Sequence, residues 1–571
     1  MKGIVVKIKR NAIVAMLVDP ERAVKLAVSE ALTYKVAGAD HTTAAQSGNW
    51  DGHSSFFSMK KNSFPAGFCR YLKKKLEAQG AKVYIMQAEV PEPLGPESPI
   101  VDNFPHNPDY DYQFDTVNRL IILKAMIAQV ATGGGKSRIF RIACARIARP
   151  TLFITTRKTL MYQMAEQMGD QGRKIGILGD GVWKPEPDGI NFAIVDTVVS
   201  RLQVKPVIEL ITKELEKIED EVEDSILKIF KKKDLPTTAA ALKMAPAPIL
   251  KKLLALKESI ATKIRAKYPI DEIERKAAKK FKEKSIRRQE MVDFLRKIEF
   301  LTLEEAHEAS GNGFFEMLNQ CRNAHYRLAL TATPFMKDNE EANMRLMACT
   351  GPIGIKVTEK YLIDKGILAT PYFYYHSCEK PPGLNRGSPW TKAYQMGVVG
   401  NVARNSIVVN ECTRANKYAL PVMILIQHTN HGKKLLAMIT AAGLKVKFIS
   451  GSNNQASRQS ALNDLGSGVI DVLIGSTILD VGVDVPAVGV VFLAGGGKAE
   501  VATRQRIGRG LRSKKEGPNK CFIMDFTDEH NKHIKGHALL RREIITSTPG
   551  FAENISRVPF DYKKHGFTQC K

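Results

Sequence analysis

Three consecutive glycines followed by Lys136 and Ser137 give the strongest chemical signal in the sequence, within "MIAQVATGGGKSRIF" at residues 126–140. A phosphate-binding loop needs backbone N–H groups turned inward, which favours glycine, and a helix N-terminus behind them. It also needs a lysine for the outer phosphates and a hydroxyl for a magnesium ion. The strict pattern requires a further glycine where Val130 stands. Taken alone, the segment therefore fits either a phosphate loop or a flexible turn.

Two adjacent acids end a second apolar run, "FLTLEEAHEAS", at Glu304 and Glu305, with His307 close behind. Carboxylates at a strand end suit a magnesium site and a group that orients a water for attack on a γ-phosphate. The alternative is a helix N-terminus, where acids are stabilised by the helix dipole.

Two further segments carry polar or charged residues that could lie near a bound anion. "RLALTATPF" closes another apolar run with Thr331 to Pro334, and "QRIGRGLR" contains Arg509 and Arg512. On a helix these two arginines would share one face, as guanidiniums aimed at one anion do. The alternative for this segment is a basic solvated helix.

The elements around these motifs predict an α/β architecture. "MIAQVA" is a predicted strand before the glycines, and "SRIFRIACARIA" has helical spacing after them. Short apolar runs alternate with helical patterns from about 106 to 200, and the same rhythm starts afresh at 420–450, which is typical of parallel sheets with crossover helices. We therefore predict two tandem α/β domains, at 101–355 and 356–550, followed by a C-terminal tail at 551–571.

Residues 1–100 predict a small α+β domain that ends in a linker. Strands are predicted in "GIVVKIK" and "AKVYIM", and helices in "PERAVKLAVSEALTY" and "GFCRYLKKKLEAQG". The Pro-rich segment 90–99 is the predicted linker.

Residues 203–297 break the strand–helix rhythm with charged, helix-favouring sequence, which predicts a helical insertion in the first α/β domain. Its charged face is compatible with simple solvation of a hairpin, with a nucleic-acid contact, or with a protein partner.

The composition favours a polyanionic partner. The chain has 571 residues and a formal net charge of +26, so nucleic acid or an anionic surface is expected. No apolar run reaches the roughly 18 residues of a membrane span, and we predict no membrane partner. The eight cysteines are scattered without a C-x-x-C pair, which favours a reducing cytoplasm.

Taken together, the order and spacing of these segments resemble superfamily 2 helicases and translocases over residues 110–530. The resemblance implies two tandem RecA-like domains that use ATP and Mg²⁺. "DYQ" is similar to the adenine-reading glutamine motif, "VATGGGKS" to motif I, "LEEAH" to motif II, "TATP" to motif III, "GSTILDVGVDVP" to motif V and "QRIGRGLR" to motif VI.

The resemblance assigns site residues by motif. Those implied for nucleotide binding are Gln113, Thr132, Gly133, Gly134, Gly135, Lys136, Ser137, Gly482 and Asp484. Those implied for catalysis are Lys136, Glu304, Glu305, Gln505, Arg509 and Arg512, and those implied for magnesium are Ser137 and Glu304. Glu305 would polarise the attacking water and the two arginines would act as arginine fingers. Most family members have aspartate where Glu304 stands, so the metal contact would have to readjust by about a bond length.

Nucleic-acid contacts are implied for Arg157, Thr197 and Thr477, from the segments similar to motifs Ia, Ib and V. "YLIDKGILATPYF" and "SGNWDGHSSFFSMKKNSFPAGF" resemble the phage UvsW-type helicases, relatives of RecG that remodel branched DNA, and this adds Trp50. A packed aromatic at Trp50 and a hairpin turn at Asp51-Gly52 are the alternatives.

The expected function is an ATP-dependent DNA helicase or translocase on forked or branched DNA, in replication, recombination or repair. We expect a monomer in the cytoplasm, phage-encoded if the UvsW-type resemblance holds. The alternatives are an RNA helicase, the motor subunit of a restriction or defence system, and a non-hydrolysing nucleic-acid clamp.

Overall fold

The computed structural model describes residues 1–570 apart from 88, 103–106, 234, 236, 238–246, 307–310, 336–338, 477–487, 498–503, 505–506, 509 and 515. The chain forms two compact units. The first comprises Met1–Val195 with Lys297–Lys571, and the second is Asp196–Arg296.

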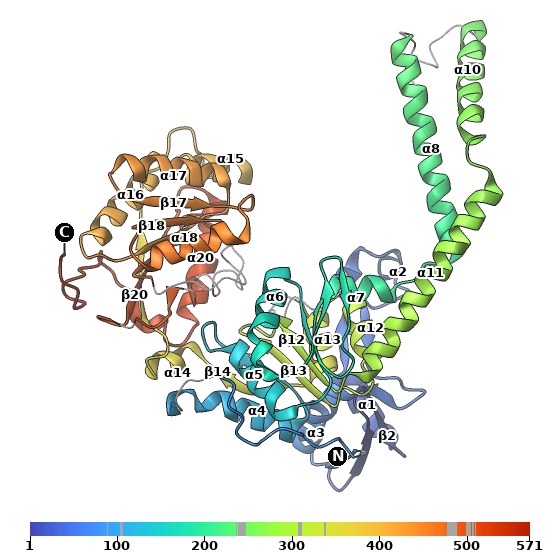
Figure 1. The fold of residues 1–571 in the computed structure, drawn as a ribbon, viewed down its shortest axis with the longest axis horizontal. Helices are drawn as coiled ribbons and strands as arrows, with labels where there is room; N and C mark the ends of the chain where they lie inside the picture. Colours follow the sequence, from blue (N-terminus) through green and yellow to red (C-terminus); the bar gives the residue numbers. More distant parts are fainter. Residues whose placement is uncertain are drawn as a thin grey trace. The chain divides into compact units, whose positions relative to one another are not determined.

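An eight-stranded sheet is the centre of the first α/β lobe (Figure 1). Neighbouring strands are parallel except for β10, which pairs antiparallel with β9. In sheet order the strands are β10 (Val182–Lys184), β9 (Ile175–Gly179), β11 (Ile190–Ile194), β8 (Thr151–Thr155), β12 (Phe300–Glu304), β13 (Tyr326–Thr331), β7 (Ala125–Val130) and β14 (Ile353–Val357). Because β12, β13 and β7 are adjacent and parallel, the loops that follow them meet at one edge of the sheet.

Helices cover both faces of this sheet, which is why its central strands β8, β11 and β12 are buried along their whole length. They are α4 (Asp111–Leu123), α5 (Lys136–Ile147), α6 (Lys158–Gln167), α12 (Asn312–Gln320), α13 (Glu340–Thr350) and α14 (Glu359–Asp364).

The second lobe has a six-stranded sheet whose neighbouring strands are all parallel. In sheet order they are β15 (Thr370–His376), β20 (Lys520–Phe526), β19 (Val490–Phe492), β16 (Val422–Leu425), β18 (Val472–Gly475) and β17 (Val446–Ile449). Its helices are α15 (Trp390–Tyr394), α16 (Val402–Asn416), α17 (Thr429–Ala441), α18 (Gln455–Gly466) and α20 (Lys532–Thr546). The predicted fold class, two tandem parallel-sheet RecA-like domains, is therefore confirmed.

The C-terminal segment, described as far as residue 570, is part of the second lobe. Phe560 and Tyr562 are buried in the same core as β16 and β20. The N–H of Ser556 donates to the carbonyl of Phe373 on β15, at 2.8 Å. These contacts make the segment a covering layer of the lobe.

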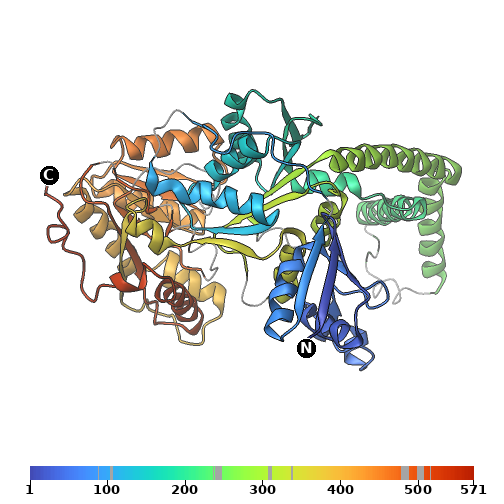
Figure 2. The same cartoon turned by 90° about the horizontal axis from the view of Figure 1, so that it is seen from below.

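The N-terminal domain is built on a four-stranded sheet with the order β5-β2-β1-β6 (Figure 2). These strands are β5 (Ser63–Pro65), β2 (Val14–Val18), β1 (Val5–Arg10) and β6 (Lys82–Gln87), with helices α1 (Arg22–Ala31) and α3 (Cys69–Ala78). A short helix α2 (Thr43–Gln46) and a ribbon of β3 (Thr33–Lys35) and β4 (His53–Ser55) complete the domain. Both predicted strands and both predicted helices are present.

Strand β2 was not predicted. The side chain of Asn11 accepts hydrogen bonds from the N–H groups of Ile13 and Val14, at 2.9 and 2.7 Å. This turn folds the chain back, so that β2 pairs antiparallel with β1.

The Pro-rich segment 90–99, predicted as a linker, lies along the first lobe. The N–H groups of Leu94 and Gly95 donate to the carbonyls of Ile147 and Arg146, both at 3.1 Å. A Cβ atom at Gly95 would lie 1.8 Å from the carbonyl oxygen of Ala145, so only glycine fits. The segment thus caps the C-terminus of α5.

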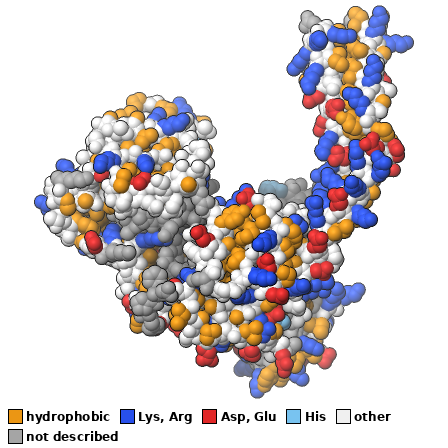
Figure 3. Space-filling view, viewed as in Figure 1, with side chains coloured by type: hydrophobic (Ala, Val, Ile, Leu, Met, Phe, Trp, Pro, Cys, Tyr) orange, Lys and Arg blue, Asp and Glu red, His pale blue; other side chains and the backbone are white. Residues whose placement is uncertain are grey.

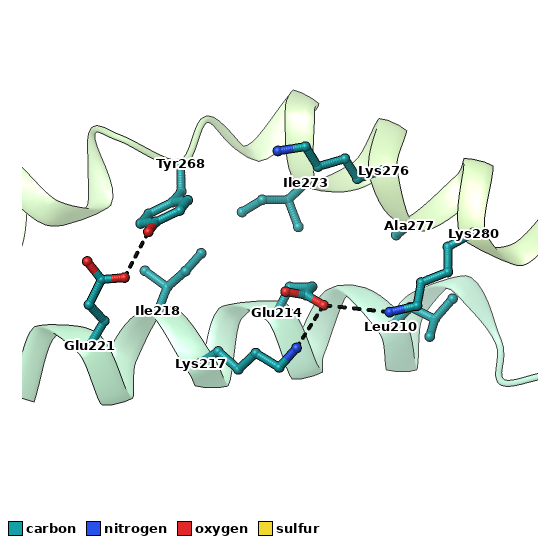
Figure 4. A pocket seen from close by; sticks show the side chains of 10 residues that line it. All are labelled: Leu210, Glu214, Lys217, Ile218, Glu221, Tyr268, Ile273, Lys276, Ala277 and Lys280. Carbon is teal, nitrogen blue, oxygen red and sulfur yellow. Dashed lines mark hydrogen bonds and ion pairs between the residues drawn. The ribbon is translucent and has the colours of Figure 1, made fainter. Parts of the chain in front are cut away.

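The second unit is helical. Its helices are α7 (Val195–Leu202), α8 (Val207–Lys232), α10 (Ala247–Arg265) and α11 (Ile270–Lys297). The core between α8 and α10 is formed by Val222, Phe230, Leu253, Ile260, Ala261 and Ile264. Between α8 and α11 the helices leave a cavity of about 470 Å³, in which Ile218 and Ile273 face each other (Figure 4).

Candidate nucleotide-binding site

The glycine loop joins the end of β7 to the start of α5. Gly133 and Gly135 have φ angles of +87° and +75°, and residues other than glycine rarely adopt such backbone angles. A Cβ atom at Gly134 would lie 2.7 Å from Cγ1 of Val130. Helix α5 begins at Lys136, directly after the last glycine. A strand, a glycine loop and a helix N-terminus are therefore arranged as an anion-binding loop requires.

Buried polar side chains of α4 support the loop from behind. The hydroxyl of Tyr112 donates to the carbonyl of Gly134 at 2.7 Å, and Nε2 of Gln113 lies 3.4 Å from the same oxygen. Nη1 of Arg138 donates to Oε1 of Gln113 at 2.6 Å, and its Nε lies 2.8 Å from Oδ2 of Asp102. Gln113 is thus oriented by the loop and by Arg138.

The two acids of motif II have different surroundings. Glu304 is the last residue of β12, as predicted, and its side chain is buried. Glu305 follows in a left-handed conformation with φ of +48°. Its Oε1 lies 3.6 Å from Nζ of Lys136, and each of these side chains is 12% exposed. The structure therefore brings Lys136 and Glu305 together.

The surroundings of Glu304 fit a carboxylate that binds a cation. Burial raises the pKa of Glu304 to about 8, while Lys136 acts to lower it and Glu305 to raise it. Its Oε2 has no hydrogen-bond partner among the described residues. An orphaned buried carboxylate oxygen next to a phosphate loop fits a magnesium ion, with the hydroxyl of Ser137 as the second donor.

Motif III lies on the strand between the other two motifs. Thr331 ends β13, and its Oγ1 accepts a hydrogen bond from the N–H of Thr333 at 3.2 Å. Nε2 of Gln129 on β7 donates to the carbonyl of Ala332 at 3.3 Å. The predicted positions of motifs I, II and III at the ends of strands are confirmed. The structure adds that these three strands are adjacent in the sheet.

A glycine of motif VI touches motif I. A Cβ atom at Gly508 would lie 2.6 Å from Cβ of Thr132, so the two backbones approach closely. Nearby, Nη1 of Arg504 lies 3.6 Å from Oε1 of Glu359. None of these three residues, Gly508, Arg504 and Glu359, was predicted, because each contact joins segments far apart in the chain. A glycine between two arginines in "RIGRG" was the available signal for the first.

The predicted position of Arg512 on a helix is wrong. The sequence placed it on a helical face together with Arg509, but its backbone forms a β-bridge with Leu368. The carbonyl of Leu511 accepts from the N–H of Ala369 at 2.7 Å, so this pairing ends the helix before Arg512. Burial lowers the pKa of its guanidinium. The residue is anchored to the segment that joins the two sheets.

Several predicted residues lie outside the described part of the chain. They are His307, Thr477, Gly482, Asp484, Gln505 and Arg509.

The predicted nucleic-acid residues lie on separate elements. Arg157 precedes α6, where its N–H donates to Oγ1 of Thr155 at 3.2 Å, and Thr197 lies in α7 of the second unit. Nε1 of Trp50 donates to the carbonyl of His53 at 2.7 Å, and Gly52 has φ of +78°. Trp50 therefore stabilises the turn at Asp51-Gly52.

None of the described helices combines the length and apolar character that a bilayer span requires.

Comparisons with known proteins match both lobes. The family described as "Type III restriction enzyme, res subunit" matches residues 109–336, and the family "Helicase conserved C-terminal domain" matches residues 405–514. The chain is 22% identical over 267 residues to "Putative helicase 22" of Sulfolobus islandicus filamentous virus, covering 44% of this chain and 47% of that protein. It is 25% identical over 163 residues to the pre-mRNA-splicing ATP-dependent RNA helicase prp28 of Botryotinia fuckeliana, covering 28% and 18%. The chain thus spans less than half the length of these relatives.

Among solved structures, UvsW of bacteriophage T4 is 15% identical, with 95% of this chain and 97% of that chain covered and a TM-score of 0.40. The two family matches fall on the two lobes that carry motifs I to III and motif VI, and they make the chain a member of the superfamily 2 helicases.

Proposed function

We propose that this chain is an ATP-driven helicase or translocase that acts on forked or branched DNA. The observation that carries the proposal is the glycine loop at the N-terminus of α5, with Lys136 at 3.6 Å from Glu305 and the buried Glu304 beside it. The three groups that phosphoryl transfer needs, a backbone anion cradle, a cation and a carboxylate, lie at one sheet edge.

Each residue has a distinct part in ATP hydrolysis. The N–H groups of residues 133–137 bind phosphate oxygens, and Lys136 exchanges the carboxylate of Glu305 for the outer phosphates of ATP. Glu305, released from Lys136, orients the attacking water and accepts its proton. Ser137 and Glu304 would hold Mg²⁺, which when bound neutralises charge on the phosphate oxygens. Arg509 and Arg512 stabilise the transition-state charge as arginine fingers.

Coupling to the second lobe follows from the contact of Gly508 with Thr132, which joins motif VI to the phosphate loop. ATP binding and hydrolysis at the phosphate loop would therefore move the second lobe through this backbone contact. Unequal grip of the two lobes on a strand would turn each ATP cycle into a step along the nucleic acid.

DNA is the proposed substrate because the chain resembles the UvsW type and carries a net charge of +26. Contacts mainly to phosphates would leave little base-sequence preference. RNA is the second candidate, since the RNA helicase prp28 is among the proteins that this chain resembles.

The second unit is proposed to contact duplex DNA or the displaced strand. Lys and Arg side chains occur along its length (Figure 3). Part of this charge is compensated inside the unit, since Arg265 pairs with Glu219 at 2.7 Å and Lys280 with Glu214 at 4.0 Å. On α11, Arg275, Lys279 and Lys282 are exposed and suit a phosphate backbone.

The rate of ATP hydrolysis with different nucleic acids tests the substrate. We expect forked and four-way DNA to stimulate hydrolysis more than single-stranded DNA and far more than RNA hairpins of matched sequence. A rate that RNA alone stimulates would contradict the DNA proposal and support the RNA helicase.

A further inference from the structure

The N-terminal sheet has one covered face and one open face. Along β1, buried and exposed residues alternate, and the same alternation occurs in β2. The buried side chains include Ile8, Leu17 and Val83, which pack in the core of the domain. The opposite side chains would ordinarily be polar, because a half-covered sheet faces water on that side.

Instead, the open face carries five large apolar side chains. Their exposed fractions are 53% for Val5, 43% for Val14, 43% for Met16, 46% for Tyr84 and 41% for Met86. Tyr84 and Met86 are neighbours along β6, as Val14 and Met16 are along β2, and β1 lies between these two strands. Exposed apolar side chains gathered on one face and flanked by polar residues are a mark of interaction sites.

Lysines alternate with these apolar side chains. Lys7 pairs in register with Tyr84, Lys9 with Met86 and Met16, and Lys82 with Val5. Nζ of Lys82 lies 5.5 Å from the centre of the Tyr84 ring. No acidic residue occupies an outward position of β1, β2 or β6. The open sheet face is thus both basic and apolar.

We propose that the open sheet face binds a single-stranded nucleic acid, with a base stacked on Tyr84 and phosphates on Lys7, Lys9 and Lys82. Stacking needs unpaired bases with free faces, and methionine and valine side chains extend the apolar platform beside the ring. A duplex offers only its phosphates to a surface of this kind, so exposed apolar residues would add little. The proposal deepens the proposed function by naming where an unpaired strand binds, and it rests on that function for the substrate class.

Binding of labelled oligothymidylate, oligouridylate and a blunt hairpin duplex to the full chain, measured by fluorescence anisotropy, tests the proposal. We expect Tyr84→Ala to weaken single-strand binding by about 5- to 30-fold and Tyr84→Phe to retain it, because phenylalanine preserves stacking. Duplex binding should change less than twofold. The DNA and RNA oligonucleotides decide which strand is preferred.

The lysines have a matched control within the same domain. Lys7→Ala combined with Lys9→Ala should reduce the salt dependence of single-strand binding by about 1.4 in log–log slope, because two phosphate contacts are lost. Lys74→Ala combined with Lys75→Ala removes the same charge from exposed positions of α3 and should leave binding unchanged.

Unchanged single-strand binding by Tyr84→Ala would overturn the proposal. So would self-association of the wild-type chain in sedimentation that Tyr84→Ala abolishes, since the face would then bind a second copy. A wild-type chain whose ATP hydrolysis no nucleic acid stimulates would instead contradict the proposed function, so the two failures are distinguishable.

Discussion

Glu304 and Glu305 are adjacent in the chain but differ in what they contact. Glu304 is buried in the last position of β12, while Glu305 turns toward Lys136. Replacing Glu305 by Gln keeps its size and removes its charge, so ATP should still bind. Hydrolysis should fall by about 10²-fold or more, because the carboxylate no longer accepts a proton from water.

Single-turnover hydrolysis and equilibrium binding of a fluorescent ATP analogue separate the two effects. If Glu305→Gln hydrolysed ATP at the wild-type rate, its assignment as the water-orienting carboxylate would be wrong.

Gly508 has room for no side chain. An added Cβ atom would meet Thr132 at 2.6 Å, so Gly508→Ala must displace motif VI from the phosphate loop. We expect the rate of ATP hydrolysis to fall about tenfold, since misplacement by about an ångström has costs of this order or larger. Gly536→Ala is the matched control, because nothing lies within 4 Å of its added Cβ. Equal hydrolysis rates of the two variants would show that the close approach is unimportant.

At the scale of elements, two buried histidines make the second lobe sensitive to acid. Burial lowers the pKa of His376 to about 4, aided by Arg414 and Arg404, and that of His431 to about 3, aided by Arg404, Lys434 and His428. The unfolded chain takes up these protons near pH 6.5 and the folded chain does not. The stabilisation is therefore present above that pH and is lost as the pH falls below it.

When the pH falls from 7.5 to 5, protonation of each histidine in the unfolded chain should lower the free energy of unfolding by about 2 kcal/mol. Urea denaturation at both pH values measures this loss. In the His431→Gln variant, the free energy of unfolding should fall by only about half as much between the two pH values. This holds whatever the variant's stability at pH 7.5. If the free energy of unfolding of the variant fell by as much as that of the wild-type chain, the assignment of this loss to His431 would be wrong.

Strong apolar patterns made the central elements predictable. The strands β12 and β13 are buried along their whole length, and β7 is buried except at Gln129. A glycine loop or a pair of polar residues marks the end of each strand. Strand β2 escaped prediction because a side-chain turn at Asn11 separates it from β1 without glycine or proline. Its alternation of exposed and buried residues was the remaining signal.

The contacts that complete the site could not be predicted in the same way. Tyr112 and Arg138 support the loop through hydrogen bonds whose partners only the fold brings close. Arg512 was placed on a helix by its spacing, but pairing of its backbone with Leu368 prevails over local helical preference. Tertiary pairing of this kind leaves no trace in residue spacing.

At the scale of the whole molecule, the helical insertion should add to the affinity for branched DNA. Changing Arg275, Lys279 and Lys282 of α11 to Gln removes three exposed charges. The log–log slope of fork binding against salt should then fall by about 2.7, since about 0.9 is lost for each phosphate contact. The same change at Lys251, Lys252 and Lys263 of α10 is the control, and it should leave the slope unaltered. Equal slopes for both variants would assign the insertion a structural or protein-binding role.

Strand separation by the wild-type chain and by Lys136→Ala tests most directly whether the phosphate loop drives a helicase. A forked DNA with one labelled strand is mixed with the protein, ATP and Mg²⁺, and release of the labelled strand is followed over time. We expect release by the wild-type chain only when ATP is present. We expect no release by Lys136→Ala, because the phosphate loop has lost its lysine. Release without ATP, or release by Lys136→Ala at the wild-type rate, would contradict the claim that this loop drives a helicase.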